Sequence, residues 1–92
     1  MEAGILVYGI GATTAALHCP DLRIAHDVID DHHRRLAGSR VNVEREPYRS
    51  IWMDAAVESE AAARQDPSTF CAGLRRDYGP TGAIFPGLVR DR

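Results

Sequence analysis

Five side chains of this sequence could take part in chemistry. His32 lies in a segment of helical periodicity, where an imidazole can accept or donate a proton near neutral pH. Asp54 lies in an apolar segment, where burial would raise the pKa of a carboxylate toward that of a general base. Tyr8, Trp52 and Asn42 supply the aromatic walls and the polar group of a small-ligand pocket. The sequence predicts His32 and Asp54 as catalytic residues and Tyr8, Trp52 and Asn42 as substrate-binding residues.

Each of these residues also has a structural interpretation that the sequence leaves open. His32 could lie at the edge of the core with its ring bonded to a carbonyl oxygen. Asp54 could form an ordinary ion pair with Arg45 or Arg49. The aromatic residues could belong to the core or to a subunit interface.

Neither a metal nor a cofactor is expected. His26, Asp30 and His33 share one flank of a predicted helix, but the sequence shows no partners that would orient them as metal ligands. The run Gly9–Ala12 follows an apolar segment but lacks the third glycine of a dinucleotide-binding turn. All eleven basic residues are arginine, which excludes a Schiff-base lysine.

Composition limits the size of the fold and the class of partner. Ninety-two residues, 45% of them hydrophobic and 26% charged, are typical of a single globular domain spanning residues 1–92. The net charge of −2 argues against a nucleic acid as partner. No apolar run approaches 18 residues, and the first residues lack the basic region of a signal peptide, so we expect a cytoplasmic protein without a membrane span.

Two cysteines, Cys19 and Cys71, lie far apart and form no CxxC pair. They indicate neither a disulfide framework nor a zinc site. Two buried free thiols are the expectation for a cytoplasmic protein, and a single bridge between them remains open.

The elements that would position the candidate residues alternate between strand and helix. Strands are expected where β-branched and apolar residues cluster or alternate, at residues 4–10, 40–46, 50–57 and 83–89. A helix is expected over residues 21–37, with Asp21 as its N-cap and Gly38 after its end. Residues 50–57 could also be helical, because Ala55 and Ala56 favour that state.

A second helical region covers residues 58–65 and continues, after a break at Asp66-Pro67, to about Tyr78. Gly79-Pro80 ends it, and a single helical turn is expected near residues 13–17. The order βαββαβ predicts an α+β, ferredoxin-like fold with two helices on one face of an antiparallel sheet. The other face of that sheet would be covered by a second copy of the chain.

The chain resembles the dimeric α+β barrel superfamily, which includes antibiotic-biosynthesis monooxygenase-like proteins and small polyketide cyclases. The resemblance depends on the segments ILVYGI and SIWMDAAV, on the broken helix around Asp66–Phe70, and on the exit at Gly79-Pro80. It implies a homodimer with a cavity for a small aromatic or polyketide-like molecule. Relatives of this kind include cofactor-free oxygenases, cyclases and isomerases.

The first functional hypothesis is therefore a small-molecule-binding dimer, acting as a cofactor-free monooxygenase, cyclase or isomerase. The alternative is a non-catalytic protein-interaction subunit or a helix-turn-helix-like DNA-binding module built from residues 13–33. Asp27, Asp30 and Asp31 in the supposed recognition helix would repel phosphate groups, which argues against the DNA-binding form.

Overall fold

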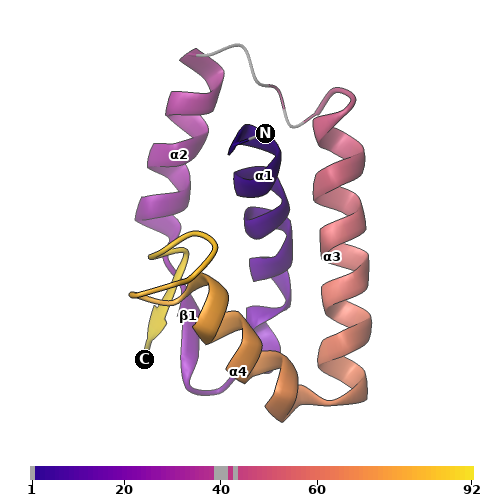
Figure 1. Ribbon diagram of the computed structural model, residues 1–92, viewed down its shortest axis with the longest axis vertical. Helices are drawn as coiled ribbons and strands as arrows, with labels where there is room; N and C mark the ends of the chain where they lie inside the picture. The colour runs from indigo at the N-terminus through magenta and orange to yellow at the C-terminus, as the bar shows by residue number, and fades with distance from the viewer. Residues whose placement is uncertain (1, 39–41, 43) are drawn as a thin grey trace.

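The computed structural model describes residues 2–38, 42 and 44–92, and in that part of the chain helices dominate (Figure 1). The helices are α1 (Glu2–Thr13), the short 3₁₀ helix η1 (Thr14–His18), α2 (His26–Gly38), α3 (Tyr48–Gln65) and α4 (Pro67–Tyr78). Two short strands, β1 (Leu22–Ile24) and β2 (Val89–Asp91), pair antiparallel, with Ile24 opposite Val89.

The predicted ferredoxin-like βαββαβ fold, and with it the dimeric α+β barrel, is wrong. Residues 4–10 lie within α1 and residues 50–57 within α3, so the helical alternative for 50–57 is the correct one. Of the predicted strand 83–89, residues 83–88 form bends and turns, and only Val89 belongs to a strand, β2. The predicted strand 40–46 lies partly outside the described residues, and its described C-terminal part, 44–46, contains turns.

Helix α1 is the central element of the molecule. Figure 1 shows it between α2 and α3, with α4 crossing near its C-terminal end. Leu6, Val7 and Ala12 are buried on different sides of this helix. A helix that is apolar around its whole circumference has no amphipathic period, so its sequence resembles that of a buried strand.

Two glycines let other elements approach α1 closely. A Cβ atom at Gly11 would lie 2.5 Å from the Trp52 carbonyl oxygen of α3, and one at Gly9 would lie 2.8 Å from the Tyr78 ring of α4. Glycine supplies the missing volume at such contacts. The Gly9–Ala12 run therefore serves helix packing.

The two ends of α4 confirm the predicted break at Asp66-Pro67 and the predicted end at Gly79-Pro80. Asp66 caps the helix by accepting a hydrogen bond from the Thr69 backbone N–H at 3.2 Å, and Pro67 occupies its first turn. The helix ends before Gly79, as expected. The predicted single helical turn after α1 is also present, as η1.

The predicted helix 21–37 begins later than expected. Its first residues form β1, which pairs with β2 at the other end of the chain, and α2 starts at His26. The Ala25 N–H donates to the Leu88 carbonyl oxygen at 2.9 Å, which extends the contact between the two segments. Asp21 is therefore not the helix cap.

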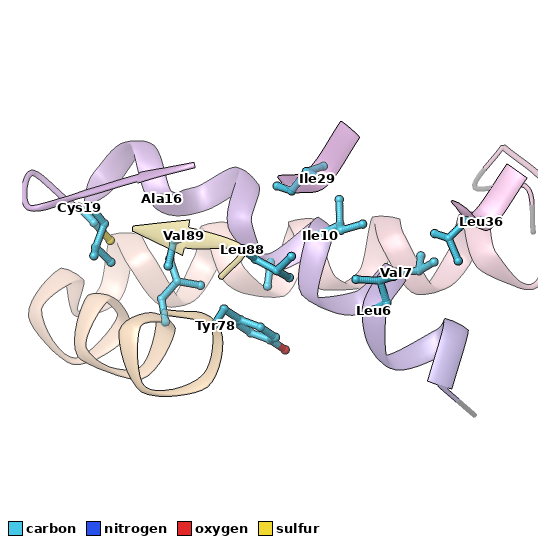
Figure 2. Packing of buried hydrophobic residues seen from close by; sticks show 13 residues of the cluster. Leu6, Val7, Ile10, Ala16, Cys19, Ile29, Leu36, Tyr78, Leu88 and Val89 are labelled. Atoms are coloured by element: carbon cyan, nitrogen blue, oxygen red, sulfur yellow. The ribbon is translucent and has the colours of Figure 1, made fainter. Parts of the chain in front are cut away.

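A disulfide joins Cys19, just after η1, to Cys71 of α4, across 52 residues of sequence. This bridge corrects the expectation of two free thiols. Cys19 is buried in the hydrophobic core, where side chains from α1, α2, α4 and β2 meet (Figure 2). Among the described residues, no helix combines the length and apolar character that crossing a membrane requires.

Candidate functional site

The two predicted catalytic residues lie on different helices and do not form one site. His32 is on α2, and its ring packs edge-on against Phe85 with the centroids 5.0 Å apart. Asp54 is exposed on α3. Figure 1 shows α1 between these two helices, so proton transfer through His32 and Asp54 together has no structural basis.

The surroundings of His32 favour its neutral form. Partial burial lowers the pKa of the imidazole, and the positive charge of Arg35 lowers it further, against a smaller opposing effect of Asp31. A half-buried ring packed against Phe85 fits the core-edge position of the structural alternative, and the bond to a carbonyl oxygen stays a prediction.

Tyr8 and Asp54 are the predicted residues that lie in one neighbourhood. The Tyr8 hydroxyl donates a hydrogen bond to Glu58 Oε2 of α3 at 3.0 Å. Burial raises the pKa of Tyr8, and the hydrogen bond and charge of Glu58 and then the charge of Asp54 raise it further. No ion pair joins Asp54 to Arg45 or Arg49 in the part of the chain that the structure describes.

The other two predicted binding residues lie elsewhere. Trp52 is half-buried against the core and lines a separate hollow near the start of α3 together with Met53. Asn42 is exposed, and its Oδ1 accepts a hydrogen bond from the Glu44 backbone N–H at 2.8 Å. The predicted pocket between Tyr8, Trp52 and Asn42 is therefore not formed.

An apolar groove runs over Tyr8 instead, and we name it the Tyr8 groove. It consists of two adjoining hollows, of about 490 and 260 Å³, which share Tyr8, Tyr78 and Ile84. The larger is completed by Gly4, Ile5 and Ile51, and the smaller by residues that include Ala12, Phe70, Leu74 and Asp77. The groove thus combines side chains of α1, α3, α4 and the turns after α4.

Large apolar side chains in this groove remain open to solvent. Ile5 is 47% exposed, Tyr8 38% and Ile84 48%. Tyr78 forms the floor: its ring lies below Leu88 in Figure 2, with its hydroxyl directed toward the Leu6 end of α1. Burial raises the pKa of Tyr78, with smaller contributions from Asp77 and Tyr8, so this phenol stays neutral.

Another hollow, of about 450 Å³, lies beside the disulfide, and its lining includes His18, Ser68 and Arg75. Its histidine and its arginine already have partners inside the chain. His18 Nε2 lies 2.9 Å from a Glu60 carboxylate oxygen, and Arg75 forms an ion pair with Asp91. Because these two side chains already pair with carboxylates of the chain, they are poor candidates for binding a charged ligand.

The helix flank that carries His26, Asp30 and His33 holds no metal site. Within residues 2–38, 42 and 44–92, no group of three or more histidine, cysteine, aspartate or glutamate side chains is placed to hold a metal ion. Asp27, on the same helix, instead forms an ion pair with Arg90 of β2 at 2.8 Å.

No protein-family model, characterised protein or solved structure matches this chain.

Sequence reasoning found Tyr8 but missed Ile5, Tyr78 and Ile84. Ile5 and Tyr8 are three residues apart, which places them on one face of a helix but on opposite faces of a strand. A helical assignment for residues 4–10 would have paired them. Ile84 joins them only through tertiary contacts, which leave no local signal.

Proposed function

We propose that this chain is a non-catalytic protein-binding module whose Tyr8 groove receives apolar side chains of a partner protein. The observation that carries the proposal is the exposure of Ile5, Tyr8 and Ile84 around one hollow of about 490 Å³. Contiguous exposed apolar surface of this kind is typical of protein interaction sites.

The structure favours this function over the catalytic one. The barrel cavity on which a monooxygenase, cyclase or isomerase depended is absent from the described fold, and the candidate acid and base lie on different helices. The Tyr8 hydroxyl is engaged by Glu58. Binding of a small aromatic ligand stays a prediction. The residues expected to bind it, Tyr8, Trp52 and Asn42, do not form one pocket.

A DNA-binding function has little support. Strand β1 occupies the segment in which a recognition helix was expected to start. Helix α2 also exposes Asp27 and Asp30 to solvent. Phosphate groups would be repelled by this surface.

We also propose that the protein works in an oxidising compartment. Disulfides persist in such compartments and are rare in the cytoplasm, so the Cys19–Cys71 bridge supports this location over the expected cytoplasmic one.

A binding titration with a model helix tests the proposed function. The probe is a fluorescein-labelled helical peptide with two leucines four residues apart and an otherwise neutral alanine and glutamine sequence. We expect saturable binding by fluorescence anisotropy, weakened at least fivefold by Ile84→Ser. The matched control is Val57→Ser, because Val57 is 67% exposed on α3 and lies outside the groove residues. No saturable binding, or equal weakening by both variants, would refute the proposal.

A further inference from the structure

We infer that the segment bound in the Tyr8 groove is a basic amphipathic helix, with arginine or lysine beside its apolar residues. This inference rests on the proposed function and specifies the partner that the groove selects. It follows from the length of the groove and from the charges along its α3 edge.

The length of the groove matches a short helix. Its lining residues on α1 extend from Gly4 to Ala12. Eight residues of helix rise about 12 Å, which is a little more than two turns. A helical partner segment places apolar side chains at positions i, i+4 and i+7 over that distance.

The charge along the α3 edge is negative. Asp54 and Glu58 are both exposed there, one helical turn apart, and the charges of both act on Tyr8. In the part of the chain that the structure describes, neither carboxylate forms an ion pair with an arginine. Two uncompensated carboxylates beside an apolar surface attract a partner that carries positive charge next to its apolar residues.

The α4 end of the groove differs from this edge. Asp77 lies there, but Arg76 neutralises it through contacts of 2.9 and 3.1 Å. The free negative charge is therefore confined to the α3 side. The basic residues of the partner should accordingly lie on one side of its apolar stripe, facing α3, and not on both.

The same charges favour a protein over a membrane surface. An anionic bilayer would be repelled by Asp54 and Glu58, whereas a basic helix would be drawn to them. A second copy of this chain is an alternative occupant that sedimentation distinguishes.

The test uses three labelled helical peptides with one apolar stripe and with lysine, glutamine or glutamate beside it. At low salt, we expect the lysine peptide to bind at least tenfold more tightly than the glutamate peptide. The double variant Asp54→Asn/Glu58→Gln should reduce this ratio to about threefold or less, and so should 0.5 M salt. The matched control Asp21→Asn/Asp30→Asn removes the same charge from exposed positions outside the groove and should preserve the ratio.

The outcomes separate the two proposals. If all three peptides bind with equal affinity and Ile84→Ser weakens them, the charge inference is overturned and the proposed function stands. If none binds, including the glutamine peptide, both are overturned. Binding of phosphatidylserine vesicles in place of the lysine peptide would also overturn the inference.

Discussion

At the scale of single residues, the contact between α1 and α3 depends on the absence of a side chain at Gly11. We predict that Gly11→Ala destabilises the protein by about 1–3 kcal/mol, the usual cost of overpacking a well-packed site. The added Cβ would meet the Trp52 carbonyl oxygen at 2.5 Å and Ala55 Cβ at 3.0 Å. Chemical denaturation measures the change.

The control for that prediction is Gly73→Ala in α4. A Cβ at Gly73 would meet only Arg76 Nη2, at 3.7 Å, which is an ordinary contact. Alanine should then stabilise the helix by up to about 1 kcal/mol. If both alanine variants change stability in the same direction, the close packing of α1 on α3 is not what Gly11 provides.

His32 gives the stability a pH dependence whose sign follows from its environment. Its pKa in the folded protein is below the ordinary value of 6.5, because burial and Arg35 disfavour the charged ring. The unfolded chain therefore takes up the proton first as the pH falls. The contribution of His32 to the free energy of unfolding is therefore fully present above about pH 6.5. It decreases as the pH falls from that value toward the lower pKa of the folded state.

We predict that His32→Gln loses less stability than the wild type between pH 7.5 and pH 5. Denaturant titrations at the two pH values measure this, with the exposed His26→Gln as the control. An unchanged pH dependence in His32→Gln would show that the ring is not buried against Phe85 as described.

At the scale of elements, the sequence predicted helix ends correctly where a few adjacent residues determine them. Asp66-Pro67 and Gly79-Pro80 defined α4, because capping and helix termination are properties of a few adjacent residues. The same reasoning failed for α1, because apolar residues occur on every side of this helix and leave no helical period in its sequence. It also misplaced the start of α2, because β1 exists only through pairing with β2, 67 residues later in sequence (Leu22 to Val89).

The candidate site was predictable only in part for the same reason. Tyr8 and Asp54 were found from their residue types, and they lie in one neighbourhood. Their partners Tyr78 and Ile84 come from α4 and the turns after it, and only the tertiary fold brings them to α1.

The disulfide is the strongest link between the segment after η1 and α4. It closes a loop of 52 residues, for which the chain-entropy model gives a stabilisation of about 4 kcal/mol. We predict that Cys19→Ala/Cys71→Ala loses about this amount in chemical denaturation. The wild type without reductant should show no free thiol in a thiol titration under denaturing conditions. Two reactive thiols, or a double variant as stable as the wild type, would contradict this role.

At the scale of the whole molecule, a chain of 92 residues has a small core, and α1 provides much of it. The disulfide and the close helix contacts support that core. The four-stranded sheet whose bare face required a second copy is absent from the described residues, so the reason for expecting a homodimer no longer holds, and we propose a monomer in its place. Three of the exposed large hydrophobic residues, Ile5, Tyr8 and Ile84, lie together in the Tyr8 groove, which we propose is filled by a different protein.

Sedimentation equilibrium of the isolated protein, from low to high micromolar concentration, tests that claim most directly. We predict a monomer of 10.1 kDa at every concentration, because we propose that the groove binds a basic helix of another protein and not a second copy of this chain. Ile84→Ser should leave the mass unchanged. A stable dimer that Ile84→Ser converts to a monomer would contradict the account, because the groove would then bind a second copy of this chain.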